Sequence, residues 1–143
     1  MAGIRESFVV EVPRAHVFAY INDYANVPKY MFGVSRFEPT TEQTSGLGAV
    51  FDSAMTIGPK TFGSTVEITE WEQDEVIRLE SIAGFSVTTV WRFADDGDAT
   101  VLDAEFDYRL PGGLGGRALK AIIEPFVGQA IKQTKENLRT QLG

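Results

Sequence analysis

The sequence predicts an α+β fold in which a curved antiparallel sheet of about seven strands wraps around one long C-terminal helix, with two short helices after the first strand. Three observations predict this class. Apolar residues alternate with period two in the second half of the chain, short turn sequences separate the alternating runs, and a helical apolar stripe occupies the C-terminus. The 143 residues, 43% of them hydrophobic, suit a single domain over residues 1–143.

The first third of the chain contains one strand, two short helices and a second strand. A strand is expected over residues 4–11, after which Pro13 stands in the first turn of a short helix, where a proline is tolerated. A second short helix is predicted over residues 26–31, with Asn26 as its N-cap. The next strand is expected over residues 34–41.

The first predicted hairpin turns at residues 58–61. A four-residue turn at this Gly-Pro sequence would pair Met55 with Ser64 and Phe51 with Ile68. Because the apolar parities of the two runs then match, both runs would bury the same face.

The second hairpin leaves two alternatives open. A three-residue loop ending at Gly84 would pair Leu79 with Val87 through a bulged turn. A two-residue turn would instead place Arg78 and Glu80 on the buried face. We prefer the bulged loop, because the alternative buries two charges.

The third hairpin is predicted from an Asp-Gly dipeptide at residues 96–97. A type I′ turn there would pair Asp95 with Asp98 and set Trp91 opposite Leu102. Both apolar sets then lie on one face of the sheet. The opposite face of the last strand carries a like-charged ladder, and its expected cross-strand partners are Arg92 and Arg78. The ladder consists of Asp103, Glu105 and Asp107.

The last predicted element is a helix over residues 114–142 with an apolar stripe along one face. Pro125 lies inside this stripe and should kink or break the helix, because proline removes one helical hydrogen bond. The glycine-rich run at residues 112–116 matches no phosphate-binding motif and is interpreted as a flexible hinge.

The dimensions of these elements predict a cavity. Seven strands spaced about 4.8 Å apart make a sheet roughly 30 Å wide, whereas one helix is about 10–12 Å thick. One helix cannot cover that sheet, so side chains, water or a ligand must fill the space between the sheet and the C-terminal helix. The alternative is that aromatic rings fill it completely as ordinary core.

The inward parity of the strands and the apolar helix face supply the candidate ligand-binding residues. Aromatic rings dominate this set, and its hydroxyl-bearing members would orient a polar group of the ligand. The expected lining consists of Phe51, Ser53, Met55, Ser64, Val66, Leu79, Phe85, Val87, Thr89, Trp91, Phe93, Ala104, Phe106, Tyr108, Ile122, Phe126 and Ala130.

Composition excludes several kinds of function. The absence of cysteine excludes disulfides and thiolate chemistry, and His16 is the only histidine, so neither a metal site nor a cofactor is expected. A net charge of −7 argues against a nucleic-acid partner. No apolar run reaches the roughly 18 residues of a bilayer span, and the N-terminus lacks a signal-peptide pattern. We therefore expect a cytoplasmic protein without stable membrane insertion.

Several short motifs occur in the order found in a known superfamily. They are Val12-Pro13 followed by Val17-Phe18, Asn22-Asp23-Tyr24 followed by Val27-Pro28-Lys29-Tyr30, Gly46-Leu47-Gly48 before a strand, and Trp91-Arg92-Phe93 before an acidic turn. The segment from Asp23 to Tyr30 resembles an Asp-x-x-x-x-Pro-x-Trp opening, with Tyr30 in place of tryptophan. Over essentially its whole length the chain resembles the helix-grip proteins of the START-related (SRPBCC) superfamily, which include polyketide cyclases and dehydrases.

This resemblance implies a deep cavity for a molecule of the lipid, polyketide, quinone or steroid class. We expect a cofactor-independent protein that binds or carries such an apolar or amphipathic small molecule. A polyketide aromatase/cyclase or dehydratase is the first alternative, and it gains support if Arg78 and Glu80 face the cavity. A ligand-free interaction or toxin-like module is the second. No catalytic residue is assigned, because His16 is expected on a solvated helix face.

Overall fold

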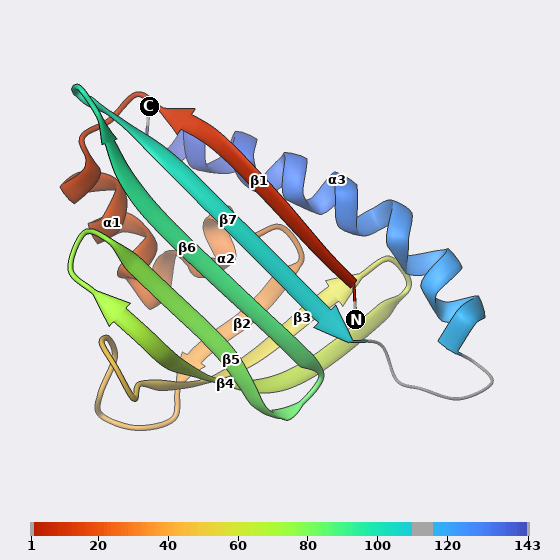
Figure 1. Cartoon of the computed structure of the whole chain (residues 1–143). Helices are drawn as coiled ribbons and strands as arrows, with labels where there is room; N and C mark the ends of the chain where they lie inside the picture. The colour runs from red at the N-terminus through yellow and green to blue at the C-terminus, as the bar shows by residue number, and fades with distance from the viewer. Residues whose placement is uncertain (1, 110–115, 143) are drawn as a thin grey trace.

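The computed structural model describes residues 2–109 and 116–142, apart from the side chains of residues 2, 57, 116–120 and 122. It confirms the predicted fold class: a seven-stranded antiparallel sheet, a long C-terminal helix and short helices after the first strand (Figure 1). The elements are β1 (Ala2–Val10), α1 (Arg14–Asn22), η1 (Tyr24–Asn26), α2 (Val27–Tyr30), β2 (Val34–Pro39), β3 (Val50–Ile57), β4 (Lys60–Glu72), β5 (Val76–Gly84), β6 (Ser86–Asp96), β7 (Ala99–Arg109) and α3 (Gly116–Leu142).

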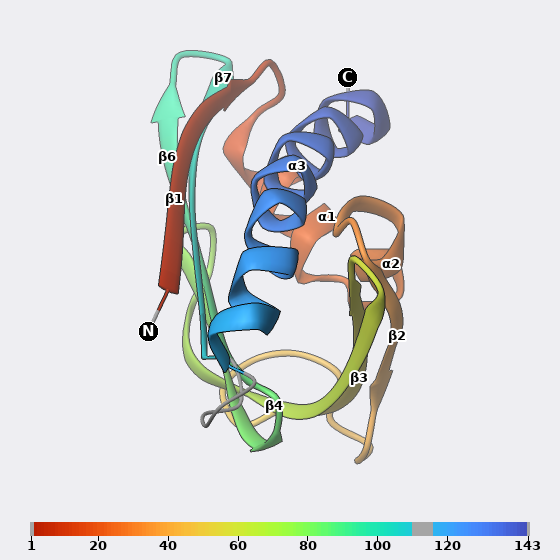
Figure 2. The ribbon, with the colours of Figure 1, turned by 90° about the vertical axis from the view of Figure 1, so that its right-hand side faces the viewer.

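The strands follow the order β1-β7-β6-β5-β4-β3-β2. The segment with the three short helices therefore connects the two edge strands of the sheet. Figure 2 shows the sheet bending, so that β2 and β3 face β1, β7 and β6 across α3. Two register irregularities in the 13-residue strand β4 lie at this bend, and bulges of this kind increase local twist and curvature. The curved sheet thus has an inner face that α3 and the short helices cover.

The β3–β4 hairpin is tighter than predicted. A two-residue turn pairs Ile57 with Lys60, so Met55 lies opposite Phe62 and the predicted pairing with Ser64 is wrong. Gly58 permits this turn because its φ is +58°, a conformation that costs glycine little. The shift is by two residues, so each side chain keeps its predicted face.

The β6–β7 hairpin shows the same two-residue shift. Its turn consists of Gly97 and Asp98, and Trp91 pairs with Ala104 rather than Leu102. Gly97 has φ +63°, and positive φ at the first turn position alone is the pattern of a type II′ turn rather than the predicted type I′. The apolar parities still match, so pattern alone does not distinguish these two registers.

The β5–β6 connection confirms the prediction that Arg78 and Glu80 lie on the outer face, but the predicted register of β5 with β6 is wrong. Leu79 pairs with Thr89 rather than Val87, and the β5–β6 ladder ends at Glu80 opposite Thr88. Beyond that point β5 continues along β4 as far as Gly84, so the predicted three-residue loop is wrong. Backbone pairing with β4 continues along this part of β5, where Ala83 pairs with Thr65 and Gly84 with Ser64. Both charged side chains in question lie on the outer face, where Arg78 Nε is 3.4 Å from a Glu80 carboxylate oxygen.

The short helices differ from prediction in how they are capped. Asn26 precedes α2, but its side chain makes no capping hydrogen bond. Its side-chain nitrogen donates to the Tyr20 carbonyl at 3.0 Å, and its side-chain oxygen accepts from Lys29 Nζ at 3.5 Å. The Asp23 carboxylate instead accepts a hydrogen bond from the Ala25 amide at 3.0 Å and starts η1. In the long helix, α3 continues through Pro125, so the predicted break is absent.

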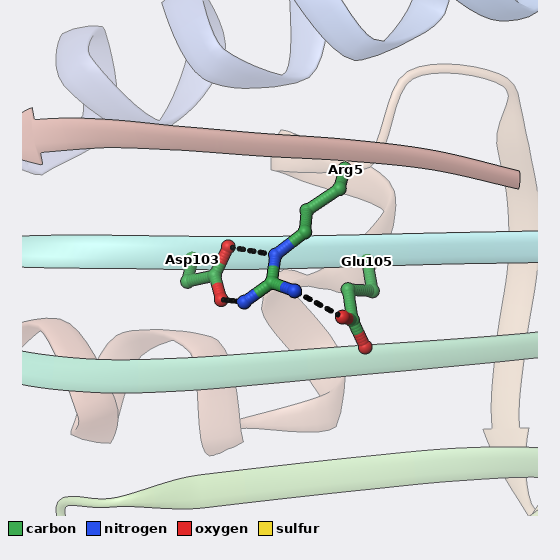
Figure 3. A network of polar contacts seen from close by, with 3 residues as sticks. All are labelled: Arg5, Asp103 and Glu105. Carbon is green, nitrogen blue, oxygen red and sulfur yellow. Dashed lines mark hydrogen bonds and ion pairs between the residues drawn. The ribbon is translucent and has the colours of Figure 1, made fainter.

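Two carboxylates on the outer face of β7 form ion pairs with the edge strand β1 rather than with β6 or β5. Arg5 of β1 forms ion pairs with Asp103 at 2.8 Å and with Glu105 at 3.1 Å (Figure 3). The predicted partners Arg92 and Arg78 do not make these contacts. The pairing of β1 with β7 places Arg5 directly opposite Glu105, and the pairing of β6 with β7 places Arg92 opposite Asp103.

Within the described ranges, no helix combines the length and the apolarity that crossing a bilayer requires.

Candidate ligand-binding site

The larger pocket lies between the inner face of the sheet and the short helices. It has a cavity volume of about 70 Å³, and its walls come from α1, η1, α2 and strands β2–β6. Aliphatic and aromatic side chains make up most of these walls. The lining consists of Ile21, Asn22, Tyr24, Val27, Tyr30, Met31, Val34, Phe37, Phe51, Ser53, Met55, Val66, Ile68, Ile77, Leu79, Val87, Thr89 and Trp91.

A second pocket of about 50 Å³ lies against α3. The sequence-based prediction of a cavity between the sheet and the C-terminal helix describes this pocket, whereas no described residue of α3 lines the larger one. The second lining consists of Met31, Phe32, Met55, Thr56, Gly58, Phe106, Phe126, Val127, Ala130, Ile131 and Thr134. Met31 and Met55 line both pockets and therefore stand between them.

The two volumes show what the site holds without rearrangement. A buried water needs about 10–15 Å³ of such volume, and an apolar cavity of about 150 Å³ binds benzene. Taken together, the two pockets approach that size. A larger ligand requires side chains to move, and the thioethers of Met31 and Met55 are flexible enough to do so.

The predicted lining residues fall into three groups. Those in the first pocket are Phe51, Ser53, Met55, Val66, Leu79, Val87, Thr89 and Trp91. Those in the second are Met55, Phe106, Phe126 and Ala130, and Ala104 borders only a third hollow of about 10 Å³. None of these three hollows is lined by Ser64, Phe85, Phe93 or Tyr108, and the side chain of Ile122 lies outside the described residues. Contact of any of them with a ligand stays a prediction.

The three aromatic residues in the last group pack against other rings. The Phe85 ring stacks on Phe62 with centroids 4.5 Å apart and lies 6.5 Å from Tyr108. The Phe93 ring meets Phe18 edge-on at 5.1 Å. These ring contacts are also what an ordinary core would show, so both interpretations of these three side chains stay open.

Sequence reasoning missed most of the wall that the short helices and β2 provide. Ile68 and Ile77 share strand parity with predicted lining residues, so alternation could have found them. Tyr24, Met31 and their helical neighbours carry no comparable signal. Their place depends on the route of the connection between the two edge strands, which periodicity does not specify.

Two polar groups in the first pocket are used by the protein itself. The Asn22 carboxamide oxygen accepts a hydrogen bond from the Trp71 indole nitrogen at 2.9 Å. The Tyr30 hydroxyl donates to the Ile21 carbonyl at 3.2 Å, and burial raises the pKa of Tyr30 far above its ordinary value. The first contact fixes the end of α1 against β4, and the second joins α2 to the end of α1.

Ser53 and Thr89 differ from these groups, because neither side chain has a hydrogen-bond partner in the described part of the chain. Ser53 is only 7% exposed. No fully buried side-chain nitrogen or oxygen among the described residues lacks a partner, so the Ser53 hydroxyl must reach open space. The open space beside it is the pocket.

The residues considered for catalysis lie outside both pockets. His16 is exposed on α1, as expected. The Thr69 hydroxyl donates to Glu80 at 2.6 Å and, together with Arg78, lowers the pKa of that carboxyl on the outer face. The described residues contain no group of three or more His, Asp or Glu side chains placed to hold a metal ion.

A curved antiparallel sheet gripping a C-terminal helix, with short helices closing an internal pocket, defines the helix-grip class of proteins. Within that class, the chain belongs to the family described as polyketide cyclase / dehydrase and lipid transport, which matches residues 1–143. Family and fold are consistent with hydrophobic ligand binding or with polyketide cyclase-like function.

Solved structures share this fold at low sequence identity. The protein TTHA0849 from Thermus thermophilus is 17% identical with a TM-score of 0.83, over 99% of this chain and 97% of that one. A START superfamily protein from Mycobacterium smegmatis is 12% identical with a TM-score of 0.76, over 98% and 96%. The Zhui aromatase/cyclase from Streptomyces sp. R1128 is 14% identical with a TM-score of 0.75, over 99% and 93%. Comparison with curated proteins gave no match.

Proposed function

We propose that the protein binds and carries an apolar or amphipathic small molecule of the lipid, polyketide, quinone or steroid class. The first pocket is the binding site, and the second pocket extends it beyond Met31 and Met55. The observation that carries this proposal is an apolar pocket whose lining includes three hydroxyls without partners in the described part of the chain, those of Tyr24, Ser53 and Thr89. An ordinary core has no use for such hydroxyls, whereas a ligand site uses them to orient its occupant.

The driving force is burial of the ligand's apolar surface. Each 100 Å² removed from water contributes about 2.5 kcal/mol, so a ligand of modest size gains enough to offset part of the cost of association. The aromatic walls add specific contacts, since the Phe37 and Phe51 rings already stack with centroids 4.6 Å apart.

Binding is favoured over cyclisation by the chemistry of the lining. Polyketide cyclisation needs an acid or base beside the substrate to assist enolisation. Among the described lining residues of the two pockets there is no carboxylate, guanidinium or imidazole. Arg78 and Glu80, whose entry into the cavity would favour an enzyme, lie on the outer face.

The test is to recover the ligand from the protein. The protein, produced in its own host and kept in native buffer, is examined by native mass spectrometry and then by organic extraction. We expect a bound mass that extraction releases, and calorimetric rebinding of the released molecule. The proposal would be contradicted if no mass co-purified with the protein and calorimetry detected no uptake of any lipid, quinone, steroid or polyketide.

A matched pair of variants places the ligand in the pocket. Thr89→Phe fills the first pocket and should abolish uptake, because Thr89 lines it. Thr88→Phe is the control, since its position pairs with Asp107 and has the opposite strand parity. Equal uptake by both variants would place the ligand elsewhere.

A further inference from the structure

The described residues that line the two pockets carry no charged side chain. Among the described residues, every side chain that lines either pocket is apolar or neutral and polar. Of the three hollows described above, the third has charged side chains among its described lining residues, and its 10 Å³ leaves room for about one water molecule. A ligand in the two larger pockets therefore meets no fixed charge from the described lining residues.

Several neutral polar groups in these walls already have partners. In the second pocket the Thr134 hydroxyl accepts a hydrogen bond from the Phe32 amide at 3.0 Å, and Thr56 shares one with Thr61 at 3.0 Å. Ser53 is the most deeply buried of the pocket hydroxyls that remain free in the described chain. A hydroxyl both donates and accepts, so it matches an alcohol or a carbonyl oxygen equally well.

A charged ligand group would be penalised in this environment. Burial of an ionised carboxylate or ammonium without a counter-charge costs far more than one neutral hydrogen bond returns. The net charge of −7 adds a further penalty for anions approaching the protein.

We infer that the site selects electrically neutral ligands: the occupant is a mainly apolar molecule whose buried polar group is a hydroxyl or a carbonyl, hydrogen-bonded to Ser53. Carboxylates and amines of the same length are excluded in their charged forms. This inference rests on the proposed function and narrows its ligand class.

The experiment compares four probes with one chain length: octan-1-ol, octan-2-one, octanoate and octylammonium. Binding is followed by calorimetry and by tryptophan fluorescence, to which Trp71 and Trp91 contribute and of which Trp91 lines the first pocket. At neutral pH the alcohol and the ketone should bind, and octanoate should bind at least about 100-fold more weakly. A carboxyl has an ordinary pKa near about 4.3, so octanoate should gain about tenfold in affinity for each pH unit lowered toward that value.

Variants then test the role of the hydroxyl. Ser53→Ala should weaken octan-1-ol and octan-2-one by about three- to tenfold, the value of one neutral hydrogen bond. Ser86→Ala is the control, because Ser86 is an exposed serine at the start of β6 that lines neither pocket, and it should leave both affinities unchanged. Circular dichroism confirms that each variant is folded.

The possible failures are distinguishable. Octanoate bound as tightly as octan-1-ol at neutral pH would overturn the selection of neutral ligands, and this comparison uses the unaltered protein. Equal affinities of Ser53→Ala and the unaltered protein for both neutral probes would overturn the assignment to Ser53. If none of the four probes and no host extract binds, the proposed function itself fails.

Discussion

Tyr30 lies where α2 meets the sheet, and its ring contacts two other aromatic rings. The ring centroids of Tyr20 and Trp91 are 5.8 Å and 5.9 Å away, and the Tyr30 hydroxyl donates to the Ile21 carbonyl. This one side chain therefore joins both short helices to β6. Because Tyr30 also lines the first pocket, its position helps to set the shape of that pocket.

The raised pKa of Tyr30 gives a prediction for alkaline pH. Burial favours the neutral phenol, so Tyr30 stabilises the fold fully below the unfolded pKa of about 10, and this contribution is lost as pH rises toward the higher folded pKa. We expect the melting temperature to fall above about pH 10. Ultraviolet titration should show that Tyr30 forms tyrosinate only as the protein unfolds.

Tyr30→Phe is the comparison for this titration. It should lower stability at neutral pH by about 1 kcal/mol, because the Ile21 carbonyl loses its donor, and it should flatten the decline above pH 10. An equally steep alkaline decline in the variant would assign the effect to other groups, such as Tyr20 and Tyr108, whose pKa values burial also raises.

Single pocket residues could be predicted only in part. Strand alternation was enough to turn Ser53 and Thr89 inward, and the structure places both in the first pocket. Whether a hydroxyl has a hydrogen-bond partner depends on neighbours from distant segments. The sequence therefore could not predict that the Ser53 hydroxyl lacks such a partner in the described part of the chain. Asn26 is of a residue type that is typical of N-caps, but its side-chain nitrogen donates to the Tyr20 carbonyl and no capping hydrogen bond forms.

At the scale of elements, the errors in the predicted strand registers come from the turns. All three hairpins could be located from the sequence, but each register is displaced by two residues from the predicted one. A shift of two leaves the alternation of buried and exposed positions intact, so hydrophobic pattern alone does not detect it. The register is set by the turn conformation, which depends on which residues adopt positive φ. In the β3–β4 and β6–β7 turns these residues are Gly58 and Gly97.

The β3–β4 turn is coupled to the long helix through Gly58. A Cβ at this position would lie 2.8 Å from the Phe126 ring, and φ is +58°. Gly58→Ala should therefore destabilise the protein by about 1–2 kcal/mol from backbone strain, with a further cost from the ring contact. Chemical denaturation measures the total.

A double-mutant cycle with Phe126→Ala separates the two terms. Because the smaller side chain removes the contact, Gly58→Ala should cost less in that background, with a coupling energy of about 0.5 kcal/mol or more. Gly97→Ala is the control, since its positive φ is similar but nothing lies within 4 Å of an added Cβ. Strict additivity of Gly58→Ala and Phe126→Ala would show that the turn and the helix are independent.

At the scale of the whole molecule, the mismatch between a wide sheet and one narrow helix predicted internal space, and two pockets are present. What the mismatch did not show is which element covers the larger one. The short helices do so because they cross from β1 to β2, the two edges of the sheet. This crossing follows from the pairing of β1 with β7, which joins residues about a hundred positions apart. The local sequence pattern does not predict such a long-range pairing.

The same arrangement makes Met31 the divider of the ligand site. Met31 follows α2 and lines both pockets, so Met31→Ala should join them into one longer cavity. Each newly buried methylene contributes about 0.8 kcal/mol. If two more are accommodated, the affinity for dodecan-1-ol relative to octan-1-ol should rise by about tenfold or more over that of the unaltered protein, as measured by calorimetry. Met31→Leu keeps the volume of the divider and should leave this ratio unchanged. An unchanged ratio in Met31→Ala, with the variant folded, would mean that the two pockets stay separate and that the ligand occupies only one of them.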